Sequence, residues 1–205
     1  TANDAIPVTI GSRPPIHQSS ITASHYALDS HAVRKREEGR VHLDGFLSYP
    51  SAVYTVPYGV MVPKEVGNLL LPVPVSGSHI GFSTLRMEPC WMAMGQAAGI
   101  ASALSIDGKV KVQNIDLSRL QDKLVDQKAT LMYFKDVDYT SPHFRMVQYL
   151  GLRGYLPEWT ARLQEPVDAT TLAAWKKLSG TDLPGIEAGK TTRLATLEMI
   201  YRKIK

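Results

Sequence analysis

Residues 68–105 read NLLLPVPVSGSHIGFSTLRMEPCWMAMGQAAGIASALS, and this stretch decides how the 205-residue chain folds. An apolar stretch, a turn rich in glycine and serine, and a run of small residues follow one another. Proline has no N–H to lose and a φ already suited to a helix, so Pro89 predicts a helix start, and the helix runs to about Ile106. The order predicts a strand, a turn and a helix whose N-terminus faces a ligand.

The small residues of this helix form a ridge, because Gly95, Gly99 and Ala103 recur four positions apart. A glycine inside a helix costs about 1 kcal/mol relative to alanine, so we expect another backbone to pack against the ridge and compensate. A helix buried against a sheet is the simplest interpretation. A membrane span is disfavoured, because the run is short and contains Gln96 and Ser102.

The residues before the helix bear on ligand binding. N–H groups at a helix N-terminus carry partial positive charge and bind phosphate, carboxylate or an electron-rich ring oxygen. In this chain the run that leads into the helix consists of Ser83, Thr84, Leu85, Arg86, Met87 and Glu88.

This region resembles a bacterial family of FAD-dependent oxidoreductases in its C-terminal part. Six blocks of that family occur here in order, and an upstream block, Tyr26 to His31, is similar to the family's Y-x-x-DSH block. The six blocks are Val56-Pro57-Tyr58, Val62-Pro63-Lys64, Asn68-Leu69-Leu70, Ser76-Gly77-Ser78-His79, Arg86-Met87-Glu88-Pro89 and Gly95-Gln96-Ala97-Ala98-Gly99. Together the blocks span about residues 24 to 106.

The resemblance implies a role for each part of the unit. Residues 68–71 form a late strand of the FAD-binding domain, and Pro89 starts its final helix, whose N-terminus faces the pyrimidine edge of the flavin. Residues 83–88 are then cofactor-binding. Negative charge builds at that edge when flavin takes a hydride, and fixed amide dipoles stabilise it without reorganising. The implied substrate is a small molecule, a carbohydrate or another alcohol.

Three residues are candidates for catalysis, each with a structural alternative. His79 lies in the turn before the helix, where it either reaches a substrate on the flavin or stabilises the turn. Arg86 either steadies an anionic flavin or a substrate carboxylate, or pairs with Glu88 or Glu65. His31 belongs to a block near the substrate side or to a polar loop. Asp29-Ser30-His31 is not a hydrolase triad, since adjacent side chains do not normally converge.

The glycine fingerprint G-x-G-x-x-G, which seats the pyrophosphate of FAD, is absent from the sequence. The resemblance therefore predicts that this chain is the C-terminal part of a longer protein. An N-terminal FAD-binding segment is then a required partner. We do not expect this chain to retain FAD by itself.

Charge and composition exclude some other functions. The formal net charge is only +4, and the densest basic cluster, Arg34 to Arg40, is interrupted by Glu37 and Glu38 and lacks interleaved aromatic residues. This pattern indicates a solvated face rather than a nucleic-acid surface. Cys90 is the single cysteine, which excludes an intramolecular disulfide and indicates a buried core residue.

No metal site is predicted. The histidines His17, His25, His42 and His143 show no ligand spacing with one another, and only His25, His31 and Asp29 offer an alternative grouping.

The whole chain is expected to be an α+β protein in three parts. Residues 1–57 hold strands and loops of a partial substrate-domain sheet, with strands near 5–10 and 41–47. Residues 58–112 hold the last strand and helix of the FAD-binding domain. Residues 113–205 form a small all-helical module, whose helices are expected at 116–130, 140–154, 168–178 and 191–204.

The helical module weakly resembles S-layer homology units. The similar motifs are Phe134-Lys135-Asp136-Val137, Tyr149-Leu150-Gly151 and Thr192-Arg193. The resemblance implies an alternative function, a non-enzymatic binding or scaffold module that recognises a cell-surface polymer. A helical cap packed on the oxidoreductase is the simpler interpretation.

Overall fold

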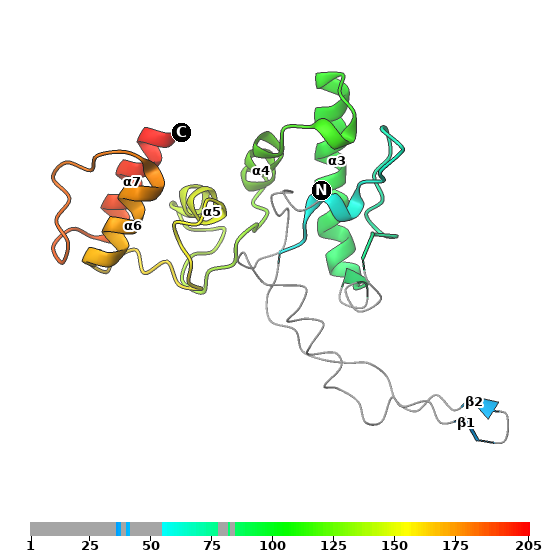
Figure 1. Cartoon of the computed structure of the whole chain (residues 1–205), viewed down its shortest axis with the longest axis horizontal. Helices are drawn as coiled ribbons and strands as arrows, with labels where there is room; N and C mark the ends of the chain where they lie inside the picture. Colours follow the sequence, from blue (N-terminus) through cyan, green and yellow to red (C-terminus); the bar gives the residue numbers. More distant parts are fainter. Residues whose placement is uncertain (1–35, 38–39, 42–54, 78–81, 83–84) are drawn as a thin grey trace.

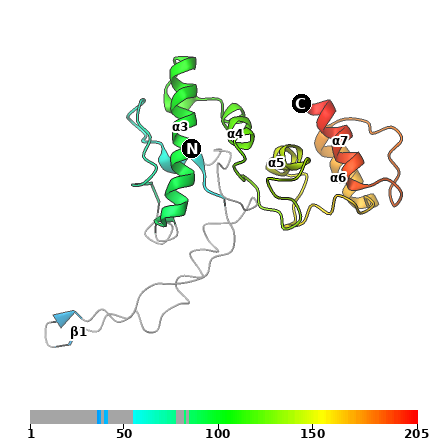
Figure 2. The same ribbon diagram turned by 180° about the vertical axis from the view of Figure 1, so that it is seen from behind.

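The computed structural model describes residues 36–37, 40–41, 55–77, 82 and 85–205. Within these residues the fold is a row of helices. Figures 1 and 2 show α3 and α4 at one end, α5 in the middle, and α6 and α7 at the other end. The five α-helices described are α3 (Glu88–Gly108), α4 (Leu117–Asp126), α5 (Phe144–Leu152), α6 (Ala169–Ser179) and α7 (Arg193–Ile204).

The expectation of an α+β fold with a sheet segment is wrong for the described part of the chain, which is helical. Its strands are β1 (Arg36–Glu37) and β2 (Arg40–Val41), an antiparallel pair of two residues each. The strand expected near 5–10 and most of that expected near 41–47 lie outside the described residues.

Residues 68–71 do not form the expected strand: Asn68 lies in a turn, and residues 69–71 have no regular secondary structure. Leu71 N–H donates to Met61 O at 2.8 Å, and further along Ser76 N–H donates to Val60 O at 2.7 Å. Pro72 and Pro74 follow directly and have no N–H to offer, so a ladder of hydrogen bonds does not develop here. The segment instead packs beside the short 3-10 helix η2 (Tyr58–Met61).

The helix α3 begins where the proline predicted it, with Pro89 as its second residue. It ends at Gly108, and Lys109 follows in the left-handed conformation at φ 49°. One face of α3 is buried, including Met94, Ala97 and Ala101. These residues belong to a first core that continues through the fully buried Leu120 and Leu124 of α4 to Leu131.

A second core lies between α5, α6 and α7. The α6 helix begins at a carboxylate cap, because Asp168 Oδ1 accepts Thr171 N–H at 2.8 Å, and it ends before Gly180 at φ 60°. The α7 helix is capped by Thr192, whose hydroxyl accepts Ala195 N–H at 3.2 Å. These two helices match the segments expected at 168–178 and 191–204.

The helix α5 connects the two cores. Phe144 packs into the first core, while Val147 and Leu150 belong to the second. The fully buried Gln148 ties the helix to the segment between them: its Oε1 accepts Leu131 N–H and Met132 N–H, both at 2.7 Å, and its Nε2 donates to Met132 O at 2.7 Å.

Candidate functional site

The start of α3 is an open helix terminus. Met87 stands before the helix in an extended conformation, and its side chain makes no capping hydrogen bond to the first turn. The N–H groups of Cys90 and Trp91 both turn back to Met87 O, at 3.0 and 3.1 Å. Pro89 has no N–H, so the Glu88 N–H is the donor of this turn for which the described residues supply no acceptor.

The residues around this terminus lie on the surface. Arg86, Met87, Glu88 and Pro89 are all exposed, and Met87 keeps 52% of its surface accessible. Leu85 differs, because its side chain is buried in the first core. It therefore positions the segment and offers a ligand only its backbone.

Arg86 has a free guanidinium within the described part of the chain. Its backbone N–H donates to Phe82 O at 3.0 Å. The alternative in which Arg86 pairs with Glu88 or Glu65 is not found, because the ion pairs of the described residues join other side chains. Among the described residues, the exposed Arg86 guanidinium therefore has no ion-pair partner.

Four of the expected site residues lie outside the described residues: His31, His79, Ser83 and Thr84. The start of α3 therefore brings together Leu85, Arg86, Met87 and Glu88 of the expected set. Roles for the two histidines and for the two hydroxyl residues stay predictions.

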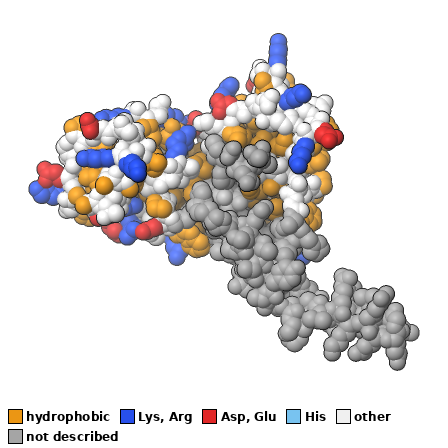
Figure 3. All heavy atoms as spheres, viewed as in Figure 1, with side chains coloured by type: hydrophobic (Ala, Val, Ile, Leu, Met, Phe, Trp, Pro, Cys, Tyr) orange, Lys and Arg blue, Asp and Glu red, His pale blue; other side chains and the backbone are white. Residues whose placement is uncertain are grey.

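Contrary to our expectation, the described residues do not cover the ridge of small residues on α3. Among these residues, no atom lies within 4 Å of a Cβ built at Gly95 or Gly99. Met92 and Ile106, further along the same helix, are each 75% exposed. Figure 3 shows hydrophobic side chains gathering over the α3 end of the molecule. A helix that is apolar on all sides is characteristic of a protein interior, so this face is suited to a further packing partner.

Trp91 is a residue that sequence reasoning missed. Its indole Nε1 is buried and has no hydrogen-bond partner among the described residues. A tryptophan one turn into an otherwise apolar helix was the available signal, because a buried indole N–H usually requires an acceptor. Cys90, beside it, is buried in the first core as expected.

The motifs that resemble S-layer homology units hold the second core together. Asp136 accepts Ala161 N–H at 2.8 Å and Arg162 N–H at 2.7 Å. Arg193 is buried, its Nε donates to Ala161 O at 2.9 Å, and its guanidinium lies 5.0 Å from the centre of the Trp175 ring. Burial lowers the pKa of Arg193. Phe134, Val137 and Arg193 are buried in the second core, whereas Asp136 is exposed.

The described part of the chain shows neither a metal-binding cluster nor a membrane-spanning helix. No group of three histidine, cysteine, aspartate or glutamate side chains there is arranged to hold a metal ion. None of the described helices has the length and apolar character needed to cross a membrane.

Comparison with known proteins gives a family match that includes the helix α3. The family model described as FAD dependent oxidoreductase matches residues 11–124, more than half of the chain, and this span includes all of α3 and most of α4. No curated protein and no solved structure matches the chain. The chain belongs to the FAD dependent oxidoreductase family.

Proposed function

We propose that this chain contributes the C-terminal part of a flavin site, with the N-terminus of α3 against the pyrimidine edge of FAD. The observation that carries the proposal is the exposed start of α3 inside the span that matches the family, next to Arg86, which forms no ion pair with another described residue. Bound FAD would itself accept the hydride taken from the substrate.

The residues at this terminus suit a group that gains negative charge. The N–H of Glu88 and the dipole of α3 provide fixed positive potential, and the guanidinium of Arg86 adds a positive charge. Such preorganised groups stabilise developing charge without reorganising. Glu88 opposes this potential with its own carboxylate, so the net effect depends mainly on Arg86.

The dinucleotide-binding unit is proposed to come from a segment other than these 205 residues, because the sequence lacks the glycine fingerprint. The uncovered apolar face of α3 supports this proposal. Gly95 and Gly99 allow a neighbouring backbone to approach closely, and the exposed Met92 and Ile106 offer apolar area on the same helix. The proposed substrate is a carbohydrate or another alcohol, with His79 and His31 near it.

The first test measures FAD binding. Titration of FAD into this chain, followed by the visible flavin spectrum and flavin fluorescence, is expected to show no saturable binding. A longer form of the protein that includes a βαβ unit with the fingerprint is expected to be yellow as purified. Stoichiometric FAD on the 205-residue chain would contradict the proposal.

The second test targets Arg86 in the flavin-loaded longer form. Arg86→Met is expected to lower the flavin reduction potential and to slow turnover, with little change in the melting temperature, because the guanidinium makes no described contact in the fold. Arg119→Met is the matched control, since Arg119 is also exposed and forms no ion pair with a described side chain, but lies on α4. Equal potentials in the two variants would remove Arg86 from the site.

A further inference from the structure

A stripe of polar side chains runs along the face of α4 that turns away from α3. Ser118, Asp122 and Asp126 are spaced four residues apart, so they lie on one side of the helix. Leu120 and Leu124, on another side, are fully buried in the first core. The α4 helix is thus packed against α3 on one side and carries acidic groups on the other.

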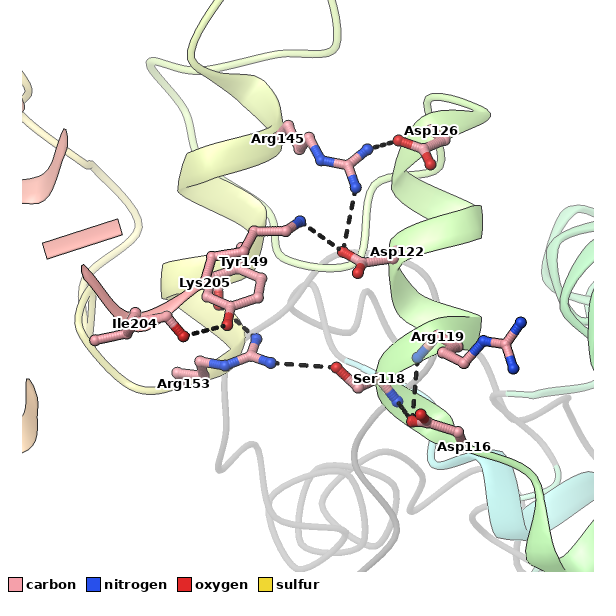
Figure 4. Close-up of polar contacts among 10 residues, drawn as sticks. All are labelled: Asp116, Ser118, Arg119, Asp122, Asp126, Arg145, Tyr149, Arg153, Ile204 and Lys205. Carbon is pink, nitrogen blue, oxygen red and sulfur yellow. Dashed lines mark hydrogen bonds and ion pairs between the residues drawn. The ribbon is translucent and has the colours of Figure 1, made fainter. Parts of the chain in front are cut away.

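A complementary stripe lies on α5. Arg145, Tyr149 and Arg153 are also four residues apart, with Arg153 just after the helix end. The two stripes run antiparallel, so the start of one faces the end of the other. Arg145 reaches the C-terminal part of α4, and Arg153 reaches its first turn, as Figure 4 shows.

Specific contacts join the stripes. Arg145 forms ion pairs with Asp126 and with Asp122, the latter at 3.4 Å, and Arg153 Nη2 donates to Ser118 Oγ at 3.4 Å. Lys205, at the end of α7, adds a second cation on Asp122, with Nζ 3.2 Å from Oδ1. These residues, together with Tyr149, are called the polar joint below.

Tyr149 holds the basic groups of the polar joint in place. The Arg153 guanidinium lies 3.5 Å from the centre of its ring, and Lys205 Nζ lies 5.1 Å from the same centre. The Tyr149 hydroxyl donates to Ile204 O at 3.4 Å, which ties the end of α7 to α5. Asp122 is therefore contacted by Arg145 of α5 and by Lys205 at the end of α7, which are far apart in sequence.

The apolar contacts beneath the polar joint do not determine the direction or register of α5 against α4. Phe144 of α5 is buried in the first core, and Leu152 contacts both cores. Apolar contact is non-directional, whereas charges of opposite sign at regular spacing favour one register and disfavour others. The ion pairs are partly exposed, with side chains 31% to 53% accessible, so salt screens them.

We infer that the polar joint sets the orientation of α4 relative to the C-terminal helices and that salt weakens it. Because α4 packs against α3, the polar joint also holds α3 in one arrangement relative to those helices. The partner of the acidic face of α4 is thus the α5–α7 part of the same chain. This inference concerns the arrangement of helices and does not depend on FAD binding.

The experiment measures the distance between the two ends of the molecule. Spin labels are placed on cysteines at the exposed positions Asp107, on α3, and Lys177, on α6. Pulsed electron resonance is expected to give a narrow distance distribution at about 0.05 M salt and a distribution at least twice as broad at about 1 M salt. Arg145→Asp is expected to broaden it already at low salt, because three carboxylates then face one another.

Charge rescue and a matched control make the experiment decisive. Asp126→Arg added to Arg145→Asp restores an opposite pair and is expected to restore the narrow distribution. Arg119→Asp makes the same charge change on α4, and Figure 4 shows Arg119 directed away from α5, so the distribution is expected to stay narrow. If Arg145→Asp fails to fold, the salt series on the labelled parent chain decides. A distribution that salt does not change would overturn the inference, as would broadening by Arg145→Asp that the second charge does not reverse.

Discussion

At the residue scale, two buried polar side chains connect distant parts of the chain. Tyr58 donates its hydroxyl proton to Val112 O at 3.0 Å, across 54 positions of sequence. Burial raises the pKa of Tyr58 to about 12. Gln148 satisfies three backbone groups at the connection between the cores. Neither side chain is part of the proposed flavin site. Both are expected to contribute to the free energy of unfolding.

The first prediction concerns alkaline pH. Because the pKa of Tyr58 is higher in the folded state, its neutral form is favoured by folding, and stability is complete below about pH 10. Above that pH the unfolded chain releases a proton that the folded chain keeps, so stability falls until about pH 12. Tyr58→Phe is expected to reduce the loss between pH 9 and pH 11 by about 1 kcal/mol, measured by urea unfolding.

Tyr139→Phe is the control for this prediction, because Tyr139 is 57% exposed. The raised pKa of Tyr155, also caused mainly by burial, leaves a residual slope in every variant. An identical pH dependence for Tyr58→Phe and the parent chain would mean that the phenol ionises as easily in the folded state as in the unfolded state.

The second prediction concerns Gln148→Leu. The substitution leaves the buried N–H groups of Leu131 and Met132 without acceptors, so the free energy of unfolding is expected to fall by about 2–4 kcal/mol. Chemical denaturation measures it. Gln96→Leu removes a hydrogen bond of 3.0 Å to Gln127 at the surface and is expected to cost far less. Equal losses in the free energy of unfolding would show that the buried Gln148 amide contributes no more to stability than the surface Gln96 amide.

At the element scale, α3 is the part whose environment differs most from the sequence expectation. If another backbone packed on the glycine ridge, as the sequence predicts, a large side chain in place of Gly99 would overpack that interface. No atom of the described residues lies near a Cβ at that position, so the described part of the chain gives no reason for such a penalty. What remains is the intrinsic preference of the helix for alanine over glycine.

Gly99→Ala is therefore expected to stabilise this chain by about 0.5–1 kcal/mol, as measured by urea unfolding. Gly151→Ala, in the helix α5, is the contrasting variant, since its Cβ would come within 3.0 Å of Phe134 Cζ and is expected to destabilise the chain. Gly99→Leu is expected to be tolerated here but to weaken association with the proposed dinucleotide-binding segment. Destabilisation by Gly99→Ala would mean that the ridge is covered.

Over the whole molecule, two cores share α5, and this predicts coupled unfolding. Trp91 contacts the first core and Trp175 lies in the second. Variants in which Trp91 alone or Trp175 alone remains of the three tryptophans are expected to report the same denaturation midpoint at low salt. Phe144→Ala removes the α5 side chain from the first core, at a cost of about 3–5 kcal/mol, and is expected to separate the two midpoints.

Coinciding midpoints in Phe144→Ala would show that the contact of α5 with the first core is not what couples the two parts. Ile204→Ala, at a partly buried position of the second core, is the control, because it weakens that core and leaves Phe144 in place.

Local sequence signals determined the helices. Pro89 located the start of α3, the segments expected at 168–178 and 191–204 agree with α6 and α7, and the motifs around residues 56–99 indicated the family. A cap or a helical proline acts within one turn, so it is readable without the rest of the fold. The end of α4 was less readable: it stops at Asp126, and Lys128 at φ 65° leaves the helical region.

Tertiary structure alone decided the rest. A strand at 68–71 requires a neighbour to pair with, and the described structure supplies only isolated hydrogen bonds there. Whether Arg86 is paired, and whether Gly99 is covered, depends on which groups surround them in space. The pairing of Lys205 with Asp122 joins residues 83 positions apart. Contacts of this kind depend on the packing of whole helices, which no local pattern of residues encodes.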